Sequence, residues 1–292
     1  MELINKQEVS KKLSGRLLLN KVLKYIFLLF TLVGLVVLAT LLIDTVLDGW
    51  RYLTPDFFTS YSSSRPESAG IYGALIGTLW LMAVTAPIAI ILSVGTALYL
   101  EEYAPKNRLV NFIKVNISNL AGVPSVVFGL LGLTLFVRLM ELDSSVLAAA
   151  LTMSLMILPV IVVASQESIR SVPSTIREAS IGMGATKWQT ITRVILPAAV
   201  PGIITGIILA LSRAIGETAP LIIIGIPTIL LFTPTGVLDT FSALPMQIYS
   251  WVKLPNPEFQ SVTAAGIIVL LFILFLMNSV AIYIRNKYSK RF

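Results

Sequence analysis

The stretch STIREASIGMGATKWQTITRVILP, residues 174–197, lies between two long apolar runs and decides the architecture of the chain. Thr175 and Glu178 have the spacing of a helix capping box, in which a hydroxyl and a carboxylate satisfy free backbone N–H groups. Thr186 and Gln189 repeat that spacing further along. The two boxes predict two short helices within this polar segment.

Two glycines stand between the predicted helices. Gly182 and Gly184 have no Cβ, so the chain can reverse there at little steric cost. Trp188, Ile191 and Ile195 then recur at three- and four-residue spacing, which predicts one shared helix face. The segment is therefore a helical hairpin, which either rests on lipid headgroups or docks onto a partner protein.

The apolar runs around the hairpin predict a polytopic, all-α transmembrane bundle. Hydrophobic residues make up 56% of the chain and charged residues 13%. A span needs about 20 apolar residues to cross a hydrocarbon core about 30 Å thick. Pro197 is expected to end the hairpin segment and open the fifth span. Six spans are expected, at residues 25–43, 71–100, 115–137, 144–166, 197–225 and 261–284.

The basic residues predict the orientation of these spans. Residues 1–24, 101–116, 166–197 and 285–292 hold 17 of the 22 Lys and Arg residues. Cytoplasmic loops carry such an excess, so both termini and the hairpin are expected in the cytoplasm. The domains expected are a basic tail at 1–24, a first span at 25–47, a permease domain at 71–284 and a basic tail at 285–292.

Two segments are expected outside. A seventh span at 218–238 would carry the basic C-terminal tail to the wrong side, so residues 227–260 are interpreted as an external or re-entrant connection. Residues 48–70 are rich in aromatic side chains. They either form an interfacial belt or provide a docking surface for an external protein; the aromatic residues are Trp50, Tyr52, Phe57, Phe58 and Tyr61.

The composition excludes several kinds of chemistry. The chain contains no Cys and no His, so disulfides, thiol chemistry, a His general base and Cys or His metal sites are excluded. It contains no G-x-x-x-x-G-K-[ST] phosphate loop. The net charge of +7 comes from basic residues at the ends of apolar runs, which favours a topological role over nucleic-acid binding. We expect neither an enzyme nor a metal site.

Arg213 and Glu217 lie inside the fifth predicted span, one helical turn apart and therefore on one face. Arg213 lies about 24 Å along the helix from Pro197, at 1.5 Å per residue. Ionisable groups inside a membrane are costly and usually functional. The pair is either a structural ion pair or a transient oxyanion site, in which Glu217 weakens the grip of the guanidinium so that the anion is released.

The spacing within the hairpin resembles the EAA loop of ABC-importer permeases, which reads EAA, three residues, Gly, nine residues, Ile, one residue, Leu-Pro. Ser replaces the second Ala and Val replaces Ile. The matching positions are Glu178, Ala179, Ser180, Gly184, Val194, Leu196 and Pro197. The resemblance implies that this loop, with Trp188, docks onto a separate ATPase subunit, whose nucleotide-driven closure rocks the spans between two access states.

Three further stretches are similar to the PstA-type permeases of phosphate importers: residues 68–78, 122–130 and 211–221. The last contains Arg213, Glu217 and Thr218, which the resemblance places along the substrate path. It also implies a location in the bacterial cytoplasmic (inner) membrane and no cofactor in this chain, with ATP and Mg²⁺ bound by a partner. The implied partners are a PstC-like sister permease, a dimeric PstB-like ATP-binding subunit and a PstS-like extracytoplasmic phosphate-binding protein.

Alternatives remain at two points. Pro124 and Gly129 either bend and line a gate or only permit close helix packing. The cargo is phosphate, or another oxyanion such as sulfate or molybdate; a secondary transporter driven by an ion gradient would leave the EAA-like loop without a purpose. Protonated phosphate can donate a hydrogen bond to Glu217, whereas sulfate at neutral pH has only acceptors, and this difference favours phosphate.

Overall fold

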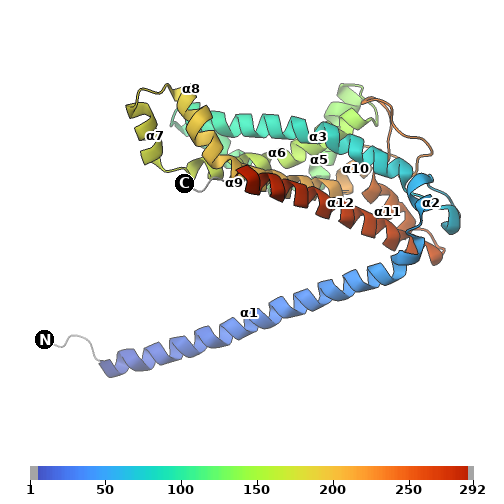
Figure 1. The fold of residues 1–292 in the computed structure, drawn as a ribbon, viewed down its shortest axis with the longest axis horizontal. Helices are drawn as coiled ribbons and strands as arrows, with labels where there is room; N and C mark the ends of the chain where they lie inside the picture. Colours follow the sequence, from blue (N-terminus) through green and yellow to red (C-terminus); the bar gives the residue numbers. More distant parts are fainter. Residues whose placement is uncertain (1–5, 289–292) are drawn as a thin grey trace.

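The structure is a computed structural model that describes residues 6–288 (Figure 1). It is built from helices, and no strand occurs among the described residues, so the all-α prediction is confirmed. The five long helices are α1 (Lys6–Gly49), α3 (Tyr72–Leu98), α6 (Val146–Arg170), α9 (Leu196–Gly216) and α12 (Glu258–Tyr288). Each is long and apolar enough to cross a bilayer.

A bent pair of helices gives the sixth span when the two are counted as one. Helix α4 (Arg108–Leu120) and helix α5 (Ser125–Gly132), which continues as a π-helical segment η4 (Leu133–Leu139), meet at an angle of 105°. The span expected at 115–137 is therefore not one continuous helix but a pair broken near Pro124. Pro124 precedes α5 with an extended ψ of 140°, and proline also disfavours helical geometry in the residue before it, which explains the break.

The shorter elements connect or cap the long ones. They are η1 (Trp50–Tyr52), α2 (Pro55–Thr59), η2 (Pro66–Ser68), η3 (Tyr99–Tyr103), α7 (Ser174–Gly182), α8 (Lys187–Thr190), η5 (Ile191–Ile195), α10 (Ala219–Ile223) and α11 (Leu244–Val252). Segments η3, η4 and η5 are π-helical and extend α3, α5 and α8 without a break.

Helix α6 is the centre of the bundle and packs against α3, α5 and α9. Small residues make the close approach possible, since a Cβ on Gly132 would collide with Thr152 and one on Gly206 with Ala164. Polar side chains also join the helices: the Ser93 hydroxyl donates to the Leu158 carbonyl at 3.2 Å. These contacts fix the positions of the helices that pack against α6.

Helix α1 diverges from the rest of the bundle (Figure 1). It meets α12 only near its own C-terminal end, where Gly49 lies against the backbone of Ala264 and Ala265. None of its most apolar stretch is buried against the other described residues. The single helix Lys6–Gly49 runs through the boundary at residue 24 that the sequence suggested between a basic tail and the first span.

The connection after α9 folds back into the bundle. Helix α10 packs on α5, and α11 packs on α12 and α3. The start of α9 and the C-terminal end of α12 lie at the end of the bundle that carries α7 and α8 (Figure 1). The connection between α9 and α12 therefore begins and ends at the same end of the bundle and does not cross it. This arrangement supports the re-entrant interpretation. The expectation that the fifth span reaches residue 225 is wrong, because α9 ends at Gly216.

A tight turn closes this connection at residues 235–239. The Asp239 carboxylate accepts hydrogen bonds from the Thr235 hydroxyl and backbone N–H and from the Gly236 N–H, and these bonds hold the pKa of Asp239 below its usual range. The Asp239 carbonyl in turn accepts from Val146 N–H at 3.0 Å. The turn thus satisfies a free donor in the first turn of α6.

Candidate functional site

The hairpin α7–α8 projects from one end of the bundle, called here the hairpin end (Figure 1). Gly184 has φ +88°, a left-handed conformation that favours glycine, and it turns the chain between the two helices. The Ser180 and Thr190 hydroxyls lie 2.9 Å apart in a buried contact that joins α7 to α8. The predicted hairpin is therefore present. Ser180 is buried and joins the two helices, and it is not exposed on the hairpin surface.

The two predicted capping boxes have different outcomes. The second is confirmed: Gln189 N–H donates to the Thr186 hydroxyl at 3.3 Å, and Thr186 N–H donates to Gln189 Oε1 at 2.9 Å. The first is wrong, because α7 begins at Ser174 with Pro173 as its N-cap. Thr175 is then already inside the first turn and cannot occupy the capping position, which leaves Glu178 exposed.

The hairpin presents an apolar patch that the rest of the described chain leaves uncovered. Met183 is 84% exposed, Trp188 65% and Ile181 56%. Ala179 and Gly184 lie exposed in the same hairpin. Exposed large apolar side chains gathered on a short, well-ordered element mark a binding surface for a protein or a membrane.

The expectation that Trp188 shares a face with Ile191 and Ile195 is wrong. Both isoleucines are buried against the bundle, whereas Trp188 is exposed in the first turn of α8. The π-helical geometry from Ile191 onward changes the register of the face. The same segment explains why Pro197 does not end the helix. A π-helical turn already displaces the usual hydrogen bonds before it, and Leu196 and Pro197 simply open α9.

A charge network fastens the hairpin to the bundle. Glu101 Oε1, at the end of α3, lies 2.8 Å from Lys114 Nζ of α4 and 2.9 Å from Arg170 Nη2 of α6. Glu102 lies 3.3 Å from Arg177 Nη2 of α7, and the same nitrogen donates to the Ile169 carbonyl at 2.7 Å. Four elements meet here, and the hairpin itself is held by one ion pair and one hydrogen bond, both from Arg177, as well as by its chain connections.

Sequence reasoning missed this network. It treated Lys114, Arg170 and Arg177 only as markers of the cytoplasmic side. The available signal was Glu101-Glu102, two adjacent carboxylates placed directly after an apolar run of thirty residues, on the side that carries the basic excess. Carboxylates in that position need cationic partners.

The pair Arg213–Glu217 lies at the opposite end of α9 from the hairpin. Arg213 Nε donates to Glu217 Oε1 at 3.1 Å, so the predicted ion pair forms. The geometry differs in one respect, because α9 ends at Gly216 and Glu217 has an extended ψ of 125°. Thr218 is the N-cap of α10. The Arg213 side chain is 48% exposed, so its guanidinium is accessible at the surface of this chain.

The helix after the bend packs against the segment that follows the Arg213–Glu217 pair. A Cβ on Gly129 of α5 would come within 2.9 Å of the Pro220 Cα of α10, three residues after Glu217. Pro124 sits at the 105° break before α5. Close packing and a bend are therefore both observed, and they place the bent span directly against the segment that follows Arg213 and Glu217.

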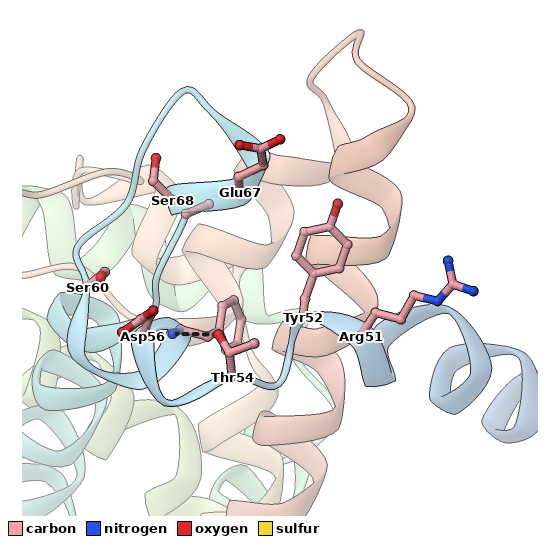
Figure 2. Close-up of a pocket in the computed structure, with 9 residues that line it drawn as sticks. Arg51, Tyr52, Thr54, Asp56, Ser60, Glu67 and Ser68 are labelled. Carbon is pink, nitrogen blue, oxygen red and sulfur yellow. Dashed lines mark hydrogen bonds between the residues drawn. The ribbon is translucent and has the colours of Figure 1, made fainter.

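The segment 50–69 folds over the end of the bundle opposite the hairpin (Figure 1). Its side chains line a pocket of about 180 Å³ (Figure 2). The Thr54 hydroxyl accepts from Phe57 N–H at 3.4 Å, while Arg51 extends away from the other labelled side chains. Phe57 is buried beside Trp251, with ring centroids 6.2 Å apart. The segment is thus an ordered cap with a polar hollow.

Comparison with known proteins shows which family the chain belongs to. Residues 89–289 match the family described as binding-protein-dependent transport system inner membrane component. The chain belongs to this family. A relative from Mycobacterium tuberculosis (strain CDC 1551 / Oshkosh), phosphate transport system permease protein PstA 1, is 37% identical over 248 residues, covering 82% of this chain and 79% of the relative. The PstA of Haemophilus influenzae is 28% identical over 269 residues, covering 92% and 94%.

Solved structures agree on the fold. A chain of a bacterial alginate ABC transporter aligns with a TM-score of 0.63 at 18% identity, covering 99% of both chains. A chain of the MetNI methionine ABC transporter aligns with a TM-score of 0.59 at 16% identity, covering 75% of this chain and 98% of that one. The family match and the PstA relative make this chain a multi-pass membrane permease of the PstA-like ABC-importer class, a transport subunit. Membership of this family disfavours the secondary-transporter alternative.

Proposed function

We propose that this chain forms half of the translocation path of an ATP-driven phosphate importer in the bacterial cytoplasmic membrane. The names of its PstA relatives support phosphate as the cargo. The observation that carries the proposal within the chain is the accessible Arg213 guanidinium beside Glu217. Its planar fork matches the oxygens of an oxyanion, and the neighbouring carboxylate competes for it, which keeps binding transient.

The hairpin is the proposed contact with the ATPase. Its exposed Ile181, Met183 and Trp188 supply apolar surface, and Glu178 supplies an accessible carboxylate beside the small Ala179. The contacts of Arg177 with Glu102 and with the Ile169 carbonyl support transmission of force, because they connect the hairpin to the end of α3 and to α6. ATP and Mg²⁺ would be held by that dimeric partner.

The remaining partners occupy other surfaces in this proposal. A PstC-like sister permease completes the path opposite Arg213, and an extracytoplasmic phosphate-binding protein of the PstS type delivers the cargo to the end that carries residues 50–69. Pro124 and Gly129 act at the gate, since the bent span they define packs against α10, immediately after Glu217 and Thr218.

Uptake by the reconstituted complex tests the proposal. Radiolabelled phosphate is supplied with its binding protein to proteoliposomes, with and without internal ATP, for wild type and for Arg213→Ala. We expect ATP-dependent uptake in wild type and at least about a tenfold loss in Arg213→Ala, because a charge-assisted contact contributes about 1.5–3 kcal/mol. Wild-type uptake that is independent of ATP, or Arg213→Ala uptake equal to wild type, would contradict the proposed path.

A further inference from the structure

Helix α4, the first half of the bent span, has an apolar face that the rest of the described chain leaves uncovered. Leu109 and Phe112 are each 65% exposed, and Ile113 and Leu120 are exposed as well. Their positions in the helix place these four side chains on one side of it. Asn116 lies on the same side, but its amide donates to the Phe112 carbonyl of its own helix at 2.8 Å. This face belongs neither to the proposed path nor to the exposed patch of the hairpin.

The opposite face of α4 is polar and lies against the bundle. Asn111, Lys114 and Ser118 line a hollow beside α6, and Lys114 Nζ lies 2.8 Å from Glu101 Oε1. A helix on the surface of a soluble protein turns its apolar side toward the core and its polar side toward water. Helix α4 does the reverse. Its outer surroundings are therefore apolar, either the boundary of a bilayer or the surface of another protein.

The direction and level of α4 fit a bilayer boundary. The helix meets α5 at 105°, so it runs across the direction of its own span. It lies beside residues 163–170, the last two turns of α6, whereas the hairpin α7–α8 projects beyond the bundle (Figure 1). Interfacial helices lie in the plane of the membrane at this level, with the apolar face buried between headgroups and acyl chains.

The charges beside the apolar face select the kind of partner. Lys106 and Arg108 are exposed at the start of α4, and neither forms a salt bridge among residues 6–288. Residues 103–124 contain no Asp or Glu. Another permease subunit would bring a basic loop of its own to this side of the membrane and would be repelled. Anionic lipid headgroups carry the complementary charge and attract Lys and Arg near the surface.

We propose that α4 is an interfacial anchor that binds anionic phospholipid at the hairpin end of the molecule. Leu109, Phe112 and Ile113 enter the boundary between headgroups and acyl chains, and Lys106 and Arg108 bind the headgroup phosphates. The inference concerns a lipid surface and does not depend on which cargo the importer carries. It therefore goes beyond the function proposed above.

The anchor is connected to two of the long spans. Glu101 Oε1, at the end of α3, lies 2.8 Å from Lys114 Nζ of α4 and 2.9 Å from Arg170 Nη2 of α6. Lipid bound to the outer face of α4 thus holds a helix whose inner face is paired with both spans. The level of α4 in the membrane sets the level of these helix ends.

Quenching of a fluorophore by brominated lipid tests the contact directly. Leu109→Cys introduces a single cysteine into this chain, which is labelled with bimane in the intact importer complex assembled with cysteine-free partner subunits. Proteoliposomes contain phosphatidylglycerol or phosphatidylcholine, either of them brominated near the headgroup end of its acyl chains. We expect both lipids to quench. The relative binding constant should favour phosphatidylglycerol at least about fivefold, the contribution of one basic residue near an anionic surface.

The basic pair is tested with Lys106→Gln/Arg108→Gln in the same labelled chain. This variant should lose the preference for phosphatidylglycerol and keep the quenching by phosphatidylcholine, because the apolar contact is unchanged. Arg51→Gln/Lys253→Gln is the matched control, since it also removes two exposed charges but at the opposite end of the fold. Its preference should equal that of the labelled parent. A label at Phe112→Cys should give the same results as the label at Leu109→Cys.

Three results would overturn the inference. Absence of quenching by either lipid would mean that water or another subunit covers this face of α4. Equal quenching by the two lipids would remove the anionic headgroup from the interaction. A preference that persists in Lys106→Gln/Arg108→Gln would assign it to other residues. ATP-dependent phosphate uptake by the same proteoliposomes reports on the proposed transport separately, so failure of the anchor and failure of the transport proposal are distinguishable.

Discussion

Arg213 and Glu217 show what residue spacing predicts and what it does not. Their separation of four predicts that they meet, and they form an ion pair at 3.1 Å. The same spacing suggested that both residues lie in one helix, whereas α9 ends between them at Gly216. The flexibility of Gly216 and the proline at 220 end the helix, and a local contact between two long side chains survives that change.

The role of Glu217 gives the first prediction. Glu217→Gln keeps the size of the side chain and removes its charge, so a fully deprotonated anion is no longer repelled. We expect discrimination between phosphate and sulfate to fall by about tenfold, the scale of one hydrogen bond to a charged group. Uptake of both anions by reconstituted complex measures the ratio. Unaltered exclusion of sulfate would remove Glu217 from the selectivity mechanism.

Gly132 gives a second prediction at the same scale. A Cβ there collides with Thr152, whose hydroxyl is already fixed by a 2.8 Å hydrogen bond to the Ala148 carbonyl. Gly132→Ala must separate α5 from α6, and overpacking of this kind costs about 1–3 kcal/mol. We expect a lower midpoint of thermal unfolding in detergent.

Gly95→Ala is the matched control for this prediction. It lies inside α3, where nothing in the described chain comes within 4 Å of the added Cβ. This substitution should leave the unfolding midpoint unchanged or raise it slightly, by about 0.4–1 kcal/mol of stability. Equal destabilisation by the two variants would mean that the α5–α6 contact is not the cause.

At the scale of elements, the hairpin was predicted well because its signals are local. The Thr186–Gln189 capping box and the glycine turn depend only on neighbouring residues, and both are present. The bend between α4 and α5 was harder to predict, because residues 115–137 carry no charge and hydropathy does not show where a helix changes direction. Glu101 pairs with Arg170 and Glu102 with Arg177, about seventy positions further along the chain. The adjacent carboxylates indicate that cationic partners are needed, but a single sequence does not say which ones.

Gly184 provides the prediction that belongs to this element. Nothing in the described chain lies within 4 Å of a Cβ at Gly184, so this chain leaves space beside the glycine for a partner to approach closely. Gly184→Trp should therefore insert into the membrane normally while ATP-driven transport falls by about tenfold or more, equivalent to about 1.4 kcal/mol of lost docking. The yield in membranes and phosphate transported per ATP hydrolysed are the two measurements.

Backbone strain must be separated from bulk at this position, because Gly184 has φ +88°. Asn tolerates left-handed conformations better than other residues with a side chain, and it is far smaller than Trp. Gly184→Asn should therefore keep most of the transport. Loss of transport in Gly184→Asn equal to that in Gly184→Trp would assign the effect to the turn itself, and normal transport in both would contradict docking at this hairpin.

At the scale of the whole molecule, the apolar runs of the sequence predicted the number of spans. They did not predict how α1 is arranged relative to the other helices. Five long helices and one bent pair give the six expected spans. Helix α1 leaves its apolar surface uncovered by the rest of the described chain, so its position depends on lipid or on another subunit. A property set by partners has no signature in the sequence of one chain beyond apolar length.

The last prediction concerns the orientation of the chain in the membrane. The chain contains no native cysteine, so a maleimide can label only the cysteine that is introduced. Met183 in the hairpin is 84% exposed, and Leu238, in the connection at the opposite end of the fold, is 64% exposed. Cysteines at Met183 and Lys287 should react with an impermeant maleimide only in inside-out vesicles, and a cysteine at Leu238 only in right-side-out vesicles. The basic excess on the hairpin side sets this outcome. Labelling of Met183→Cys and Lys287→Cys from opposite sides would require an odd number of crossings between α7 and the end of α12, and would overturn the six-span bundle.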